Sequence, residues 1–89
     1  MHEGTDLPTK DDVAAAFGAA LRKRRKKLGV TQERLAEAAG LTPTFVSMME
    51  RGQYQPSLHT VLTIAAGLGL DAVDLISDTN DELGTRLLR

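Results

Sequence analysis

The sequence predicts an all-α protein, and three observations support that fold class. Hydroxyl residues that can cap a helix stand at Thr31, Thr42 and Ser57, each ahead of a segment with apolar patterning. Glycines stand where such segments need to end, at Gly40 and Gly69. Between these signals, apolar residues recur every three or four positions, which is the spacing of one helical face. A chain of 89 residues suits one domain with a small core and marginal stability.

Composition narrows the class of protein. The chain has no cysteine, which excludes disulfides and cysteine zinc sites, and no other residues are spaced for metal binding or catalysis. We therefore predict no metal, no cofactor and no enzymatic activity. No apolar run approaches the length of a membrane span and no signal-peptide pattern opens the chain, so we expect a soluble, cytoplasmic protein.

Charge is distributed unevenly along the chain. The formal net charge is only -1, yet cations gather in the middle, from Arg22 to Lys27 and at Arg34 and Arg51, between acidic ends. A basic middle suits a local surface that faces nucleic acid. Six consecutive cations surround a helix, so most of them are expected to be a solvated face. Arg22 and Lys23 are the better candidates to reach phosphates.

The first helix is expected to follow a flexible N-terminal arm at residues 1–10 and to begin at a cap, Asp11 or Asp12. Its apolar stripe consists of Phe17, Leu21 and Leu28.

Arg25 lies on the same stripe, between Leu21 and Leu28. An arginine in that position has to extend to solvent or find a partner, because a buried unpaired charge is costly. Glu50, next to the apolar Met49 on a later helix, is the candidate partner. We expect Arg25 and Glu50 to form a structural ion pair.

The segment from Thr31 to Gly52 predicts two short helices joined by a tight turn. In the first, the apolar positions are Leu35, Ala36, Ala38 and Ala39. In the second, Phe45, Val46 and Met49 face a core, whereas Thr44, Ser47, Met48 and Arg51 face outward. This is the geometry of a helix-turn-helix, whose second helix enters a DNA groove. The alternative is an ordinary helical hairpin in a small bundle, with its outer face merely solvated.

Two further helices are expected after this segment. The helix that begins after Ser57 should bury Leu58, Val61, Leu62, Ala65 and Leu68, with Ile64 on its flank. A short helix after Asp71 contains Val73, Leu75 and Ile76. Residues 78–89 are expected to form a C-terminal tail that takes part in dimerisation.

Residues from Phe17 to Ile76 resemble the Cro/phage-repressor-like helix-turn-helix family, also called the XRE family of transcription regulators. The match is uninterrupted, and it comprises Leu21, Arg25, Leu28-Gly29-Val30-Thr31-Gln32, Leu35-Ala36, Gly40-Leu41-Thr42, Val46-Ser47, Glu50-Arg51-Gly52, Pro56-Ser57-Leu58 and Leu68-Gly69-Leu70. The resemblance implies a compact five-helix, repressor-like DNA-binding domain at residues 11–77, with the helix-turn-helix at helices 2 and 3. It also matches the pair of Arg25 and Glu50 to a buried ion pair found in many members.

The resemblance further implies where DNA phosphates bind. Gln32 matches the family's glutamine at the start of helix 2, where an amide adds donors beside free backbone N–H groups. The loop at residues 53–55 and Ser57 match a second phosphate clamp, with Tyr54 either offering its hydroxyl or packing over the loop. The full set of expected phosphate contacts is Arg22, Lys23, Gln32, Arg51, Gln53, Tyr54 and Ser57.

Base reading is expected from helix 3, where this sequence departs from the family pattern. The candidates are Thr42, Pro43, Thr44, Ser47 and Met48. Relatives commonly place glutamine, arginine or lysine at the positions of Thr44 and Met48. Met48 donates no hydrogen bond and reads a base only by apolar contact, so direct readout should be sparse, with specificity from DNA shape or water. The alternative is that Met48 belongs to a protein–protein surface.

The leading interpretation is a sequence-specific DNA-binding transcriptional regulator, favoured as a repressor. It would bind a palindromic operator in double-stranded DNA as a homodimer, through half-sites about 34 Å apart in the major groove. The expected dimer contacts are Leu75, Ile76, Leu83, Leu87 and Leu88. The alternative is an antitoxin or adaptor whose main role is contact with a protein partner.

Overall fold

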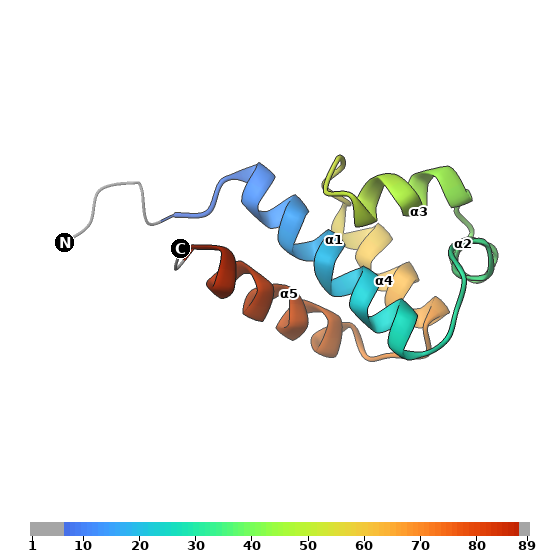
Figure 1. Ribbon diagram of the computed structural model, residues 1–89. Helices are drawn as coiled ribbons and strands as arrows, with labels where there is room; N and C mark the ends of the chain where they lie inside the picture. Colours follow the sequence, from blue (N-terminus) through green and yellow to red (C-terminus); the bar gives the residue numbers. More distant parts are fainter. Residues whose placement is uncertain (1–6, 88–89) are drawn as a thin grey trace.

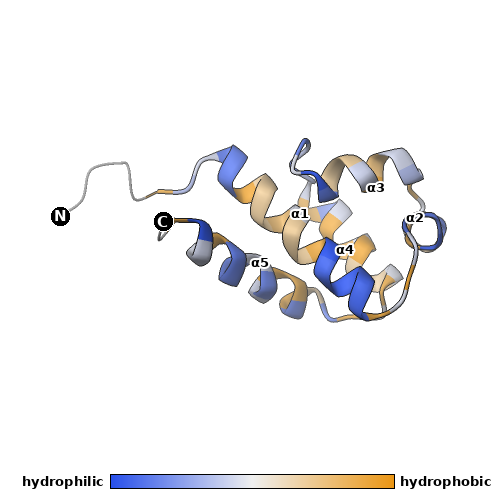
Figure 2. Cartoon of the chain, in the orientation of Figure 1, coloured by the Kyte–Doolittle hydropathy of each residue, from blue (hydrophilic) through white to orange (hydrophobic). Residues whose placement is uncertain are grey.

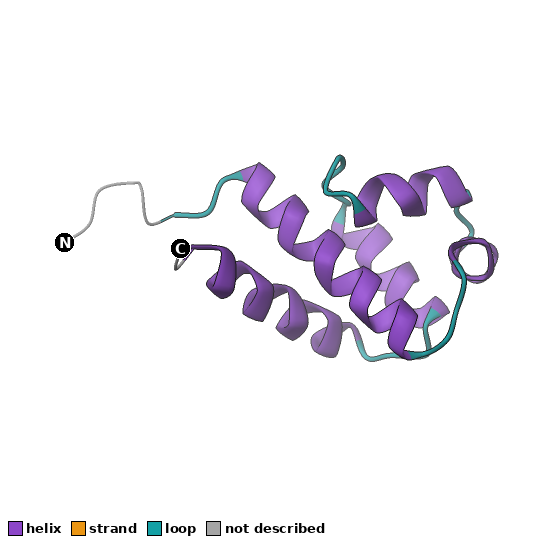
Figure 3. Ribbon diagram, viewed as in Figure 1, coloured by secondary structure: helices purple, strands orange, loops and turns teal. Residues whose placement is uncertain are grey.

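The computed structural model describes residues 7–87, and within that range the chain forms five helices and no strand (Figures 1 and 3). The helices are α1 (Lys10–Lys27), α2 (Gln32–Ala39), α3 (Pro43–Glu50), α4 (Leu58–Gly67) and α5 (Ala72–Leu87). The prediction of an all-α, five-helix fold is confirmed. Figure 1 shows α1 in the middle of the molecule, with α5 along one side and α3 on the opposite side.

The caps of the central helices agree with the sequence. The hydroxyls of Thr31, Thr42 and Ser57 accept hydrogen bonds from the backbone N–H groups three residues on, at 3.1 Å each. Gly40 ends α2 with φ of 72°, a left-handed conformation that glycine adopts without strain. Pro43 occupies the first turn of α3, where a missing N–H has no cost.

The start of α1 differs from the prediction. Thr9, not Asp11 or Asp12, is the cap, and Asp12 completes a capping box by accepting the backbone N–H of Thr9 at 3.0 Å. That hydrogen bond is the main reason why the pKa of Asp12 is lowered. Thr9 and Lys10 therefore belong to the start of α1 and not to the arm expected at residues 1–10, and the expectation for residues 1–6 lies outside the described range.

The core lies between α1, α2, α3, α4 and the start of α5. Its fully buried side chains of largest volume are Leu21, Leu35, Met49, Ile64, Leu75 and Val46. Leu28 was expected on the buried stripe of α1 but is 46% exposed, because it stands at the end of the helix, where the chain turns through Gly29. Figure 2 shows α4 as mostly hydrophobic and the last turns of α1 as hydrophilic.

The buried face of α4 also differs from the expected one. Val61, Ile64, Ala65 and Leu68 are buried, whereas Leu58 and Leu62 are 69% and 49% exposed. Two overlapping apolar stripes exist in this segment, and helical spacing alone does not choose between them. Tertiary packing selects the stripe that contains Ile64, with Gly67 set against Ala38 and Ala39 of α2.

The expected short helix and tail at 78–89 are replaced by one long helix, α5, that continues to Leu87. Ion pairs hold α5 against α1 from Asp78 onward: Arg24 with Asp78, Lys23 with Glu82 and Asp12 with Arg86. The boundary at residue 77 is therefore wrong, since the helix runs through it. In the described part of the chain no single helix is long and apolar enough to cross a membrane; α4 and α5 reach that length and apolarity only as a pair bent by 113°.

Candidate nucleic-acid interface

Helix α3 is anchored to α1 by its last turn, because Gly18 lets the two backbones approach closely. A Cβ atom added at Gly18 would overlap the carbonyl oxygen of Met49 and lie 2.8 Å from that of Glu50. One turn earlier on α1, Ala15 leaves only 3.1 Å between its Cα and a Cβ built on Gly52, which has φ of +72°. This contact joins residues about thirty positions apart, so no local sequence signal indicated the role of Gly18. It fixes α3 at one end and leaves its first turns clear of α1 (Figure 1).

The outward side of α3 carries the residues expected to read bases. Thr42, Pro43 and Thr44 are exposed, and Ser47 and Met48 are partly buried. Val46 and Met49 on the inner side are fully buried. The hydroxyl oxygen of Thr42 accepts the Phe45 N–H as a helix cap, so it retains its O–H and methyl group for other contacts. The outward side therefore offers few hydrogen-bond donors and several small apolar surfaces.

Arg25 pairs with Glu50 at the base of this surface. The Nε and Nη2 atoms of Arg25 donate to the two carboxylate oxygens of Glu50 at 2.6 and 3.0 Å. The side chains are 10% and 1% exposed, and the hydrogen bond to Glu50 is the main reason that the pKa of Arg25 is raised. Arg25 also donates through Nη1 to the carbonyl oxygen of Val30 at 2.8 Å, next to the cap of α2. One side chain thus connects α1, the start of α2 and the end of α3.

The residues expected at phosphates fall into two groups. Gln32 stands at the first position of α2, and its Nε2 donates to Glu50 at 3.0 Å. Arg51 and Gln53 are exposed beyond the end of α3 and are joined by a 3.3 Å hydrogen bond. Ser57 caps α4, so that its backbone N–H groups, more than its hydroxyl, are available to an anion. Tyr54 packs edge-on against Phe45 with ring centroids 4.7 Å apart, and the tyrosine is still 43% exposed.

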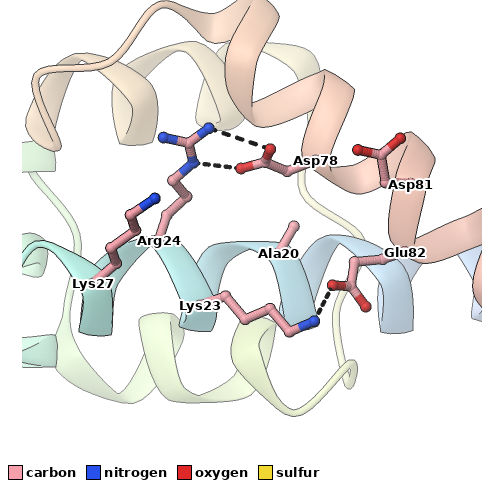
Figure 4. Close-up of a pocket in the computed structure, with 7 residues that line it drawn as sticks. All are labelled: Ala20, Lys23, Arg24, Lys27, Asp78, Asp81 and Glu82. Carbon is pink, nitrogen blue, oxygen red and sulfur yellow. Dashed lines mark hydrogen bonds and ion pairs between the residues drawn. The ribbon is translucent and has the colours of Figure 1, made fainter.

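The two candidate cations of α1 lie on different sides of that helix. Arg22 is four residues after Gly18 and three before Arg25, so it shares the side that faces α3. Lys23 instead turns toward α5, where its Nζ pairs with Glu82 at 2.5 Å (Figure 4). Arg24 and Lys27 line the same pocket between α1 and α5. This placement corrects the expectation for Lys23, which lies away from the surface that α3 presents.

The residues expected at a dimer contact are also divided. Leu75 is fully buried in the core, so its assignment to a dimer surface is wrong. Ile76 and Leu87 are 46% and 42% exposed, Leu83 is partly buried, and Leu88 lies outside the described residues. Exposed apolar residues that the pattern had not indicated for this role are Leu58, Leu62 and Val73. Val73 and Ile76 belong to a shallow groove on α5, lined by Ala72, Val73, Ile76, Ser77 and Asn80.

The fold and this surface define a helix-turn-helix protein that binds DNA. Residues 21–75 match the helix-turn-helix family, and the chain belongs to that family, as an XRE/Cro-like transcription regulator. The match covers the segment from Leu21 on α1 to Leu75 on α5. It therefore includes the anchored α3, the Arg25–Glu50 pair and both helix starts that flank α3.

Individual proteins that are similar to this chain in sequence or structure are also transcription regulators or controller proteins. The chain is 43% identical over 54 residues to an HTH-type transcriptional regulator of Methanothermobacter thermautotrophicus, covering 61% of this chain and 78% of that protein. It is similar in structure to the clp gene regulator ClgR of Corynebacterium glutamicum, with a TM-score of 0.79, 31% identity and coverage of 83% and 79% of the two chains. The restriction-modification controller protein C.Esp1396I, solved as a tetramer with its natural 35-base-pair operator, gives a TM-score of 0.74 at 25% identity, with 80% and 93% covered.

Proposed function

We propose that the protein is a repressor that binds a palindromic operator as a homodimer, with α3 of each subunit in the major groove of one half-site. The observation that carries the proposal is the open outward side of α3, which is fixed at its last turn and exposed at Thr42, Pro43 and Thr44. A rigid helix with small outward side chains can approach base edges closely. C.Esp1396I, which has a similar fold, was solved in complex with its natural operator, and this supports operator binding by the present chain.

Phosphate contacts would come from both sides of α3. Gln32 and the free N–H groups at the start of α2 lie on one side, and the start of α4 after Ser57 lies on the other. Helix N-termini attract anions through free N–H groups and the helix dipole. Arg22, Arg51 and Gln53 add side-chain donors. These contacts position the protein on the duplex, and α3 supplies the sequence preference.

The groove on α5 supports the homodimer. Its two large side chains, Val73 and Ile76, are 75% and 46% exposed in the single chain. A two-fold axis at this groove would bring each residue against its copy and bury both. A dimer would also bind DNA more selectively than a monomer, because a single module of this size buries too little DNA surface for high selectivity. Thr44 and Met48 would then read two half-sites related by symmetry.

Selection of bound duplexes from a random library tests the proposal. We expect a symmetric pair of half-sites whose centres are one helical turn apart, about 34 Å. A reporter gene with the selected site inside its promoter should be expressed less when the protein is present. Selected sites without symmetry would contradict the homodimer on DNA, and raised expression would contradict repression. Failure to retain any duplex at low salt would favour the adaptor or antitoxin alternative, in which the outward side of α3 meets a protein.

A further inference from the structure

Gln32 is held by a network that begins in the protein interior. Its Nε2 donates to Oε1 of Glu50 at 3.0 Å, and the same oxygen accepts Nη2 of Arg25 at 3.0 Å. The other oxygen of Glu50 accepts Nε of Arg25 at 2.6 Å. Arg25 is in turn bound to the carbonyl oxygen of Val30, two residues before Gln32. The network therefore fixes both the backbone that leads into α2 and the side chain of its first residue.

The chemistry of Glu50 determines which end of the Gln32 amide it can hold. An ionised carboxylate only accepts hydrogen bonds, so it binds the NH2 group and not the oxygen of an amide. One of the two N–H bonds of Nε2 is used in this contact. The other N–H remains for a second acceptor. A neutral amide can join two anions in this way, and here the charge of Arg25 compensates that of Glu50.

We propose that Glu50, anchored by Arg25, is a positioning residue for DNA binding: it orients the Gln32 amide so that the second N–H of Nε2 meets a phosphate oxygen. This inference rests on the proposed function, and it assigns to the ion pair a role beyond stability. A side chain that is ordered before binding loses less rotamer freedom when DNA arrives. Glu50 would act through Gln32 and touch no part of the DNA.

A double-mutant cycle on DNA affinity tests the coupling. The probe is one duplex recovered by selection, or a mixed-sequence duplex at low salt, and the proteins are wild type, Gln32→Ala, Glu50→Gln and the double variant. We expect Gln32→Ala to weaken binding about tenfold, the size of one hydrogen bond to a charged group. Glu50→Gln should also weaken binding, because a neutral amide no longer enforces the orientation of Gln32. In the Gln32→Ala background the same change should have almost no effect.

Two outcomes of this cycle would overturn the inference. The first is that Glu50→Gln weakens binding by the same factor in both backgrounds, which is the behaviour of a purely structural residue. The second is that Glu50→Gln binds as tightly as wild type. Val61→Ala is the stability control, since Val61 is buried in α4 and lies outside the network. At a temperature where circular dichroism shows it folded, it should bind like wild type.

A second test uses the wild-type protein alone, so it does not require that any variant folds. The side-chain NH2 signals of Gln32 and Gln55 can be compared by NMR without DNA. Gln55 is exposed and serves as the matched reference. We expect slower hydrogen exchange and a more rigid amide at Gln32, and equal behaviour would overturn the inference. If wild type binds no duplex, the proposed function fails, whereas this measurement still reports whether Glu50 holds the amide.

Discussion

The ion pair of Arg25 and Glu50 is a residue-scale determinant of stability. Both side chains are nearly inaccessible, so removing one leaves a buried charge without a partner. We expect Glu50→Ala to lower the free energy of unfolding by about 3–5 kcal/mol. Denaturant unfolding measures the change. Arg86→Ala is the control, because its pair with Asp12 is more exposed and is screened by solvent, so its loss should change the free energy of unfolding far less.

The salt dependence of DNA affinity should distinguish a neutral phosphate contact, Gln32, from a charged one, Arg22. Gln32 carries no charge, so Gln32→Ala should weaken DNA binding by a similar factor at every salt concentration and across operator variants. Arg22→Ala should instead lower the slope of log affinity against log salt by about 1, because one cation fewer displaces counterions. Titrations from low to moderate salt measure both. An unchanged slope for Arg22→Ala would place Arg22 on the solvated side of α1.

At the scale of elements, the crossing of α1 and α3 depends on the absence of a side chain at Gly18. Alanine there would overlap the backbone at the end of α3, so we expect Gly18→Ala to destabilise the fold by about 1–3 kcal/mol and to displace α3. Gly84→Ala on α5 is the matched control. Nothing lies within 4 Å of its added Cβ, so this change should stabilise the protein by about 0.5–1 kcal/mol. Thermal unfolding of the two variants would show opposite signs.

Some features of the helices could be predicted from the sequence and others could not. The caps at Thr31, Thr42 and Ser57 depend on neighbours in the chain and were predictable. The length of α5 was not, because Asn80 and Gly84 are poor helix formers and the helix is held by pairs to α1 more than fifty residues away. The close approach at Gly18 is equally nonlocal.

For the candidate site, the outward residues of α3 followed from helical spacing. The sequence did not predict that Arg22 and Lys23 lie on different sides of α1. Both are cations on one helix, and only the position of α5 distinguishes their surroundings. The bond from Gln32 to Glu50 was missed for the same reason, since it joins different helices. Local chemistry thus indicated the kind of surface, and tertiary packing determined which residues share it.

At the scale of the whole molecule, the proposed homodimer places its interface at the groove on α5. If this proposal holds, the protein is a dimer in solution, and we expect Val73→Asp with Ile76→Asp to make it a monomer, because charges at the axis would face their own copies. Analytical ultracentrifugation measures the mass, and circular dichroism should show an intact fold, since both positions are exposed. Val73→Thr, which keeps the shape and adds no charge, should remain largely dimeric. A dimer that persists in the doubly charged variant would exclude this groove as its interface.

The ion pairs between α1 and α5 have a consequence for how the protein finds its site in a genome. Lys23 and Arg24 are partnered by carboxylates of the same chain, so fewer cations remain to displace counterions from arbitrary DNA. Residence on unrelated sequence should therefore be short, and a larger share of the molecules should stay unbound. Occupancy of the operator would then follow the cellular concentration of the protein closely, because little of the protein would be bound to non-specific sites elsewhere on the chromosome.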